Sequence, residues 1–293
     1  MAGRRLTFRI MEAIALLGAG TMGSALGRRL LATGHRLTVW NRTPGRTRPL
    51  VEAGARTAAN PAEAVRDADV VITMLTDAAA VRESLFGADA AARALRPGTH
   101  LVEMSTIGPY ALRELAGQLP PGVRLVDAPV AGSAAAAEAG RLVVLAGGAE
   151  AAVDRVAPVL AALGTVRRCG GPGRGAAMKL VLNTALVTAV ASVADALAVA
   201  DAVGVDRRTA CEALAGGPLG GAVARVTTTE AAFAIALAAK DARLALDALG
   251  DAPAPVLRAA ASVLAAAPRP DADIATLTDV HPVDVTNPDK EQP

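Results

Sequence analysis

Short runs of apolar, largely β-branched residues alternate with helically patterned stretches over the first 168 residues of this 293-residue chain. This alternation predicts βαβ units and a parallel sheet. The expected strands are 13–17, 36–40, 69–74, 100–104, 123–127 and 142–146. The expected helices between them are 21–33, 46–53, 61–66, 78–94 and 109–118.

The pattern becomes purely helical from residue 173 onward, after a glycine- and proline-rich break at 169–173. One long helix is expected over 174–203, followed by helices over 207–215, 229–250 and 253–267. Such a break between two patterns is typical of a domain boundary. We therefore expect an α/β domain over 11–170 and an all-helical domain over 171–281.

The two ends and one apolar segment are interpreted separately. Residues 1–10 are basic and predict a flexible extension, and the polar, proline-rich residues 282–293 predict a disordered tail. The apolar segment 181–200 contains Asn183 and Asp195 and has no second span beside it. It therefore favours a buried helix of a soluble protein, with no membrane partner.

Composition excludes several classes of partner. The formal charge is only +2 and aromatic residues make up 2% of the chain, so nucleic-acid binding by charge or base stacking is not expected. Cys169 and Cys211 have neither metal-type spacing nor a disulfide framework, and there are three histidines. We expect no metal site and a reducing, cytoplasmic location.

Lysine is scarce, which makes each lysine informative. Of 30 basic residues only Lys179, Lys240 and Lys290 are lysines, in a chain rich in alanine and arginine. A desolvated lysine can lose its proton whereas arginine stays charged, so the two are not equivalent in proton transfer. Lysines within the folded region are therefore candidates for chemistry.

A glycine fingerprint follows the first expected strand and precedes a helix. In a dinucleotide site such glycines allow a tight turn, close approach of the pyrophosphate and close packing of helix on strand. The helix N-terminus then presents free N–H groups to the phosphates. The motif consists of Gly18, Ala19, Gly20, Thr21, Met22 and Gly23. By itself it is unspecific, but its position between strand and helix predicts cofactor binding.

The end of the second expected strand indicates which dinucleotide is bound. NAD sites usually carry a carboxylate there for the ribose 2′-hydroxyl. This chain instead has Asn41, Arg42 and Thr43, with Arg46 one turn further on. Arginine holds a phosphate bidentately, so we predict NADP(H). The alternative is that Arg42 is a solvated arginine near a turn, which would leave the identity of the cofactor undecided.

The long helix carries Lys179 and Asn183, which are four residues apart and share one face. Burial near a helix N-terminus would lower the pKa of the lysine and suit it to proton transfer. The alternative is a lysine that reaches solvent. Two loops, 105–109 and 127–133, follow strands and offer hydroxyls and N–H groups for a substrate anion. Taken alone, each loop is more often an ordinary helix cap than a binding site.

Together these segments resemble the β-hydroxyacid dehydrogenase family, which includes 3-hydroxyisobutyrate dehydrogenase and tartronate semialdehyde reductase. The resemblance runs from about residue 13 to 277. It covers the fingerprint, Asn41-Arg42-Thr43, Ser105-Thr106, Asp127-Ala128-Pro129-Val130 with Gly132, the Gly173-to-Asn183 segment, and Phe233 through Lys240-Asp241. It implies a Rossmann domain of the 6-phosphogluconate dehydrogenase type, a long interdomain helix and homodimers through the helical domain.

The resemblance also implies roles for individual residues. Lys179 would be the proton donor and acceptor, and Asn183 would orient the substrate. Ser105, Gly132 and Ser133 would bind the substrate, the latter two through its carboxylate. The cofactor would further contact Leu75, Thr76, Thr106 and Lys240. The expected activity is NADP(H)-dependent interconversion of a short β-hydroxy acid and its semialdehyde.

The chain departs from the family pattern in one loop. Ala131-Gly132-Ser133 stands where the family usually has Ser-Gly-Gly, which removes one carboxylate-binding hydroxyl. Imine reductases are close relatives with similar NADP loops, although they generally lack lysine at the position of Lys179. A non-catalytic NADP-binding scaffold is the remaining alternative.

Overall fold

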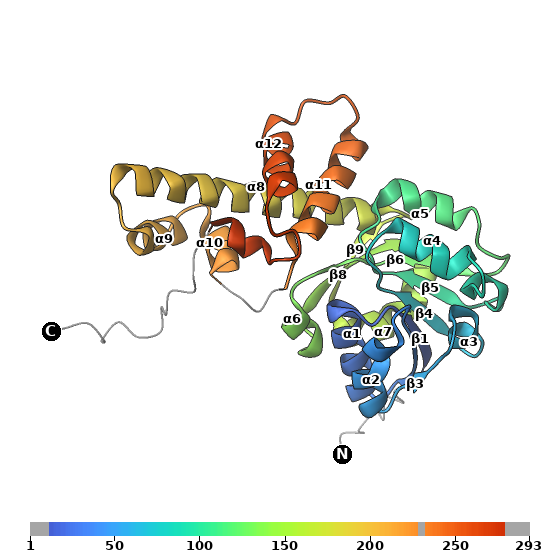
Figure 1. Cartoon of the computed structure of the whole chain (residues 1–293). Coiled ribbons are helices and arrows are strands. Elements are labelled where there is room, and N and C mark those ends of the chain that lie inside the picture. The colour runs from blue at the N-terminus through green and yellow to red at the C-terminus, as the bar shows by residue number, and fades with distance from the viewer. Residues whose placement is uncertain (1–11, 228–231, 279–293) are drawn as a thin grey trace, which may run out of the picture. The chain divides into compact units, whose positions relative to one another are not determined.

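The computed structural model describes residues 12–227 and 232–278, and the chain divides into two compact units, Met1–Ala176 and Ala177–Pro293. The expected terminal extension and tail lie outside the described residues. The first unit is a sheet covered by helices, and the second is helical (Figure 1). An α/β Rossmann domain followed by an all-α region, with one long helix running from the first into the second, is the predicted fold class and is confirmed.

The sheet has nine strands in the order β3-β2-β1-β4-β5-β6-β8-β7, with β9 paired to β8. Strands β1 to β6 are parallel, and the chain order reverses between β1 and β4. In such a sheet ligands bind beyond the carboxyl ends of the strands at the reversal. The strand bounds are β1 Ala13–Leu17, β2 Arg36–Trp40, β3 Arg56–Thr57, β4 Val70–Thr73, β5 His100–Glu103, β6 Arg124–Asp127, β7 Val130–Ala131, β8 Leu142–Gly148 and β9 Gly164–Gly170.

Alternate residues of the strands face two separate cores. On β1, Ile14 and Leu16 pack with one set of helices, while Ala15 and Leu17 pack with another. Both faces are apolar because a parallel sheet is buried on both sides. The first face is covered by α1 Thr21–Ala32, α2 Arg48–Glu52, α6 Ala134–Glu138 and α7 Glu150–Leu163. The second is covered by α3 Pro61–Val65, α4 Ala78–Phe86 and α5 Gly108–Ala116.

Several elements differ from the sequence prediction. The expected helix 78–94 ends at Phe86, where Gly87 stops it, and only a short 3₁₀ turn, η2 Ala91–Arg93, follows. Another 3₁₀ turn, η1 Pro44–Thr47, occupies the start of the expected helix 46–53. The short β3 and β7, the helices α6 and α7, and β9 were not predicted. Strand β9 has a largely exposed, polar face, so it lacks the apolar run that marked the others.

The second unit is built around α8, Arg174–Val203, which begins in the first unit. Its core also takes side chains from α9 Arg207–Ala215, α10 Gly220–Val226, α11 Ile235–Leu249, α12 Pro255–Ala266 and η4 Ile274–Thr278. Only one stripe of α8 is buried, including Val187, Val190 and Leu197, whereas Val181 and Val199 are exposed. The expectation of a buried helix therefore holds for one face of α8 alone.

Among the described residues, α8 is the single helix whose length and apolar composition would allow it to cross a membrane. This is weak evidence, since core helices of soluble proteins have the same properties.

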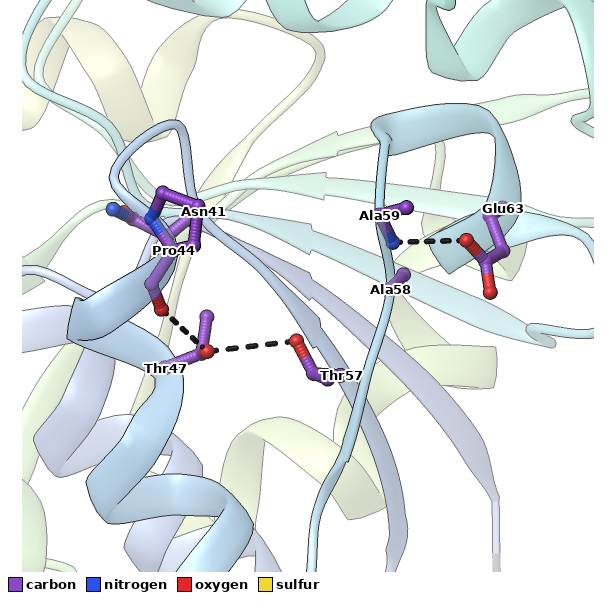
Figure 2. Close-up of a pocket in the computed structure, with 7 residues that line it drawn as sticks. All are labelled: Asn41, Pro44, Thr47, Thr57, Ala58, Ala59 and Glu63. Carbon is purple, nitrogen blue, oxygen red and sulfur yellow. Dashed lines mark hydrogen bonds between the residues drawn. The ribbon is translucent and has the colours of Figure 1, made fainter.

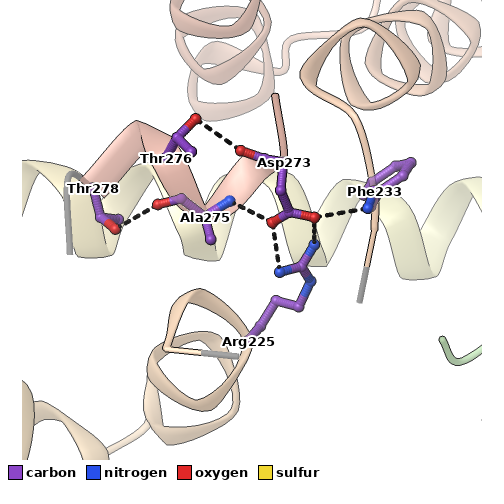
Figure 3. A network of polar contacts seen from close by, with 6 residues as sticks. All are labelled: Arg225, Phe233, Asp273, Ala275, Thr276 and Thr278. Carbon is purple, nitrogen blue, oxygen red and sulfur yellow. Dashed lines mark hydrogen bonds and ion pairs between the residues drawn. The ribbon is translucent and has the colours of Figure 1, made fainter. Parts of the chain in front are cut away.

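Helix α11 starts at Ile235, and residues 229–231 of the expected helix lie outside the described residues. A polar network holds the described residues just before the helix (Figure 3). The carboxylate of Asp273 accepts both Nη1 and Nη2 of Arg225 at 2.9 Å. It also accepts the backbone N–H of Phe233 at 2.7 Å and of Ala275 at 2.8 Å. The segment before α11 is thereby tied to α10 and η4.

Candidate active site

The glycines of the fingerprint have three distinct environments. Gly18 has φ +112°, and a Cβ there would meet the Met74 carbonyl oxygen at 2.2 Å. A Cβ on Gly23 would meet the Gly18 carbonyl oxygen at 2.1 Å, whereas a Cβ on Gly20 would meet nothing within 4 Å. Two glycines are thus required by the fold, and the third leaves backbone open to a ligand. This arrangement fits a dinucleotide pyrophosphate at the N-terminus of α1.

The residues after β2 lie beside this turn. Asn41 accepts the Ala19 N–H at 2.9 Å and donates to the Thr43 carbonyl at 2.9 Å, so one side chain joins the turn to the loop. Arg42 and Arg46 are exposed, and neither forms an ion pair with the residues that the structure describes. Two guanidinium groups therefore remain available to an anion at the edge of the sheet.

A cavity of about 410 Å³ opens at the same edge (Figure 2). It is lined by Asn41, Pro44, Thr47, Thr57, Ala58, Ala59 and Glu63. The sequence analysis did not select Glu63, which belongs to α3. Its carboxylate accepts the Ala59 N–H at 2.8 Å, and its own N–H donates to Asn60 at 2.8 Å. This reciprocal cap was readable as Asn60 followed three residues later by Glu63.

The loops after β4 and β5 are hydrogen-bonded to each other. Ser105 is 3% exposed, and its hydroxyl accepts the Leu75 N–H at 2.9 Å. Thr76 is exposed and Thr106 half-buried. The hydroxyl of Ser105, expected to contact substrate, is thus engaged within the protein.

The loop after β6 and the start of α8 are joined by Asp127. This carboxylate is 1% exposed and accepts the N–H groups of Gly173 at 2.9 Å and Ala176 at 2.8 Å. Asp127 thereby fixes the first turn of the helix that carries Lys179. The signal was present in the sequence, since carboxylates cap helix N-termini, but the partner segment lies 46 residues away.

Gly132 and Ser133 follow β7 at the start of α6. Gly132 has φ +131°, and a Cβ would meet Leu142 at 2.8 Å, so the position requires glycine. The hydroxyl of Ser133 accepts the Ala136 N–H at 3.1 Å and caps α6. Its N-cap position places the first N–H groups of this helix beside the loop.

Lys179, Asn183, Lys240 and Asp241 form one charged cluster in the helical unit. The Asn183 amide donates to Asp241 Oδ2 at 2.5 Å, and Lys240 Nζ lies 2.9 Å from Asp241 Oδ1. Asn183 and Asp241 are 5% and 3% exposed. The structure thus brings the two folded lysines and the predicted asparagine to one carboxylate.

The pKa of Lys179 is lowered from its usual value, and burial is the largest cause. Asp241 opposes this shift by stabilising the ammonium form, and Lys240 adds to it by repulsion. An amine whose pKa is moved towards neutrality is suited to both donate and accept a proton.

Asp241 is a residue to which the sequence analysis gave no role. It was noted only as the neighbour of Lys240. Asp241 is 58 residues from its hydrogen-bond partner Asn183 and on a different helix, so the sequence did not reveal the contact. Spacing identifies neighbours only within one helix. The lysine scarcity identified both of its cationic neighbours.

Fold and site together define a two-domain, dinucleotide-binding oxidoreductase, and the comparisons with known proteins agree. Residues 13–171 match the NAD binding domain of 6-phosphogluconate dehydrogenase. Residues 173–280 match the family described as NAD-binding of NADP-dependent 3-hydroxyisobutyrate dehydrogenase. The chain belongs to the family of NAD(P)-dependent β-hydroxyacid dehydrogenases, as its sequence predicted.

Individual relatives support the assignment. The 3-sulfolactaldehyde reductase of Escherichia coli K12 is 35% identical over 264 residues, which cover 86% of this chain and 88% of that protein. The structure of Mycobacterium tuberculosis 3-hydroxyisobutyrate dehydrogenase with L-serine has a TM-score of 0.79 at 30% identity, and the match covers 92% and 99% of the two chains. An imine reductase from Myxococcus stipitatus shares the fold, with a TM-score of 0.66 at 22% identity over 92% of this chain and 98% of that one.

Proposed function

We propose that this protein is an NADP(H)-dependent reductase that interconverts a short β-hydroxy acid and its semialdehyde, with Lys179 as proton donor and acceptor. The cluster of Lys179, Asn183 and Asp241 carries the proposal. It combines an amine of lowered pKa with a buried amide and a buried carboxylate, which are hydrogen-bonded to each other between α8 and α11. A scaffold that only bound the cofactor would not need this cluster.

The cofactor contacts come from the first unit. The open backbone at Gly20 and the N–H groups of Thr21 and Met22 would receive the pyrophosphate. Arg42 and Arg46, both exposed in the segment after β2 that also supplies the cavity residues Asn41 and Pro44, would hold the ribose 2′-phosphate. Leu75, Thr76, Thr106 and Lys240 would complete the contacts, as the family resemblance implies.

Three residues are the proposed substrate contacts. Gly132 and Ser133 would bind the substrate carboxylate through their backbone, because the Ser133 hydroxyl caps α6. Asn183 would orient the substrate oxygen near Lys179. The relatives are named for 3-sulfolactaldehyde and 3-hydroxyisobutyrate, so a small anionic aldehyde or hydroxy acid is the proposed class.

The chemistry follows from the amine. A nicotinamide cofactor supplies the hydride when bound. The ammonium form of Lys179 donates a proton to the substrate oxygen during carbonyl reduction, and the neutral amine accepts it in the reverse direction. Asp241 stabilises the ammonium form of Lys179 and accepts a hydrogen bond from the Asn183 amide, which restrains that side chain.

We also propose a cytoplasmic homodimer formed through the helical domain, with no nucleic-acid or membrane partner. Support comes from the surface: eight of the ten exposed large hydrophobic residues among those described belong to residues 177–293. Val199 and Val203 lie one turn apart on α8 and are 61% and 69% exposed. Exposed apolar side chains gathered in this way are typical of protein interfaces.

The activity is tested by measuring NADPH oxidation with a panel of small carbonyl compounds. The panel contains 3-sulfolactaldehyde, the semialdehyde corresponding to 3-hydroxyisobutyrate, simple ketones and cyclic imines. We expect turnover of the anionic aldehydes. Turnover of imines alone would assign the protein to imine reduction, and cofactor binding without any turnover would indicate a scaffold.

The cofactor preference is tested with Arg42→Ala. Loss of one guanidinium–phosphate contact should weaken NADPH binding by about tenfold or more, since charge-assisted hydrogen bonds contribute about 1.5–3 kcal/mol. NADH, which has no 2′-phosphate, should be affected far less. Titration of protein fluorescence or calorimetry measures both affinities. Equal weakening of the two cofactors would contradict the phosphate role, and Arg36→Ala, an exposed arginine at the opposite end of β2, is the matched control.

A further inference from the structure

Glu103 is a carboxylate buried in the first unit for which the site described above gives no use. It is 1% exposed and ends strand β5, at the edge of the sheet where the cofactor loops begin. A buried carboxylate is costly unless hydrogen-bond donors surround it. Its donors therefore indicate what it does.

Those donors lie at the end of β4 and in the loop after β5. Glu103 Oε2 accepts the Thr73 hydroxyl at 2.5 Å, and Oε1 accepts the Ser105 N–H at 2.6 Å. The Ser105 hydroxyl in turn accepts the Leu75 N–H at 2.9 Å. Since Thr73 ends β4 and Leu75 follows two residues later, these contacts close a ring between the ends of β4 and β5.

The ring lies next to the glycine turn. Met74, between Thr73 and Leu75, donates its N–H to the Leu17 carbonyl at 2.9 Å. Its own carbonyl oxygen occupies the space that a Cβ on Gly18 would need, at 2.2 Å. Movement of the β4 end would therefore displace the turn proposed to receive the pyrophosphate.

We propose that Glu103 is a positioning residue of the cofactor site, which holds the loops of Leu75–Thr76 and Ser105–Thr106 against the glycine turn. It does so through the ring with Thr73, and Ser105 serves as a link within that ring rather than as a substrate contact. This inference rests on the proposed cofactor contacts of Leu75, Thr76 and Thr106. Pre-arranged loops bind a ligand more tightly because less conformational freedom is lost on binding.

The test compares variants that keep and break the ring. Thr73→Val removes one donor with almost no change of shape, and Glu103→Ala removes both acceptors. Glu103→Gln keeps an amide oxygen for Ser105 and a polar group for Thr73. Thr99→Val is the matched control: Thr99 is also buried, at 3% exposure, but it precedes β5 at the opposite edge of the sheet.

The readout is the Kd of each folded variant for NADPH and NADH, measured together with its Tm. We expect Thr73→Val and Glu103→Ala to weaken both cofactors by about tenfold, the scale of one lost buried hydrogen bond. Glu103→Gln should restore most of the affinity, and Thr99→Val should lower Tm without changing Kd. If Glu103→Ala does not fold, Thr73→Val decides the outcome.

Two results would overturn the inference. One is wild-type affinity in Thr73→Val and Glu103→Ala, with or without a lower Tm. The other is an equal loss of affinity in Thr99→Val, which would mean that any weakening of the sheet has the same effect. If the wild-type protein bound neither dinucleotide, the proposed function would fail as well, so the wild-type titration separates the two failures.

Discussion

At the scale of single residues, the charge balance around Lys179 depends on Asp241. This carboxylate accepts the Asn183 amide and pairs with Lys240, and it favours the ammonium form of Lys179. Burial works in the opposite direction and is the larger effect, so the pKa of Lys179 stays below its usual value. Asp241 therefore sets how far the pKa falls.

Replacing Asp241 by Asn tests this balance. The variant removes the negative charge, so the pKa of Lys179 should fall further. Carbonyl reduction needs the ammonium form, so the alkaline limb of kcat/KM for reduction should move to lower pH. A pH–rate profile measures the shift. Asp247→Asn, a change of charge further along α11, is the control, and an unchanged alkaline limb in Asp241→Asn would contradict the account.

At the residue scale, the sequence predicted those features that depend on residue type alone. The glycine turn was expected from its motif, and its three glycines have separate structural reasons. Glu103, Asp127 and Asp241 were given no role, because a carboxylate in a sequence looks the same whether it is exposed or buried. Only the fold shows that each is less than 4% exposed and receives protein donors.

At the scale of elements, the start of α11 depends on a side-chain network rather than on a local signal. Asp273 joins Arg225, Phe233 and Ala275, and its pKa is lowered by the hydrogen bonds it accepts from them, against the opposing effect of burial (Figure 3). Helix α11 carries both Lys240 and Asp241. The network therefore contributes to the position of the cluster as well as to stability.

Asp273→Ala should destabilise the protein by about 2–4 kcal/mol, because it leaves a largely buried guanidinium without its partner. Chemical denaturation measures the change. Glu212→Gln is the control, since the exposed Arg208–Glu212 pair on α9 should contribute no more than about 0.5 kcal/mol. Equal effects of the two variants would contradict the role of the network.

The same network gives a pH dependence. The pKa of Asp273 is lower in the folded protein than its usual value of 3.8, so its contribution is complete above that value. It should be lost as pH falls through the lowered pKa. The stability difference between wild type and Asp273→Ala should therefore shrink only in strong acid.

Elements with apolar periodicity were predictable, and those without it were not. The six predicted strands correspond to β1, β2, β4, β5, β6 and β8 of the structure. The polar strand β9 forms because it pairs with residues 142–147 of β8. The local sequence pattern does not predict this pairing between two segments. The contacts of Asp273 with Arg225 and Phe233, just before α11, likewise join segments far apart in the sequence.

At the scale of the whole molecule, most of the exposed large hydrophobic residues among those that the structure describes belong to the helical unit. Its exposed valines include Val199, Val203, Val256 and Val263. A second copy of the chain is the proposed cover. The sequence analysis expected a dimer from family resemblance, and the exposed residues supply a physical reason for it.

Val199→Asp should disrupt that dimer, because a carboxylate would be buried without a partner. Sedimentation or light scattering measures the mass of wild type and variant. We expect a dimer for wild type and a monomer for Val199→Asp. The control is Val51→Asp, which places the same charge on an exposed valine of the first unit. A wild-type monomer, or a dimer that Val199→Asp leaves intact, would contradict the proposed interface.

The central claim is that Lys179 exchanges a proton with the substrate oxygen, and Lys179→Ala tests it most directly. The measurement is the rate of NADPH oxidation with the best aldehyde of the panel, together with the Kd for NADPH. We predict a loss of about 10²–10⁴ in kcat with NADPH binding retained, as for removal of one acid–base group. Lys179→Arg should be similarly impaired, since arginine keeps the charge but does not release a proton. Turnover of Lys179→Ala at the wild-type rate would contradict the claim.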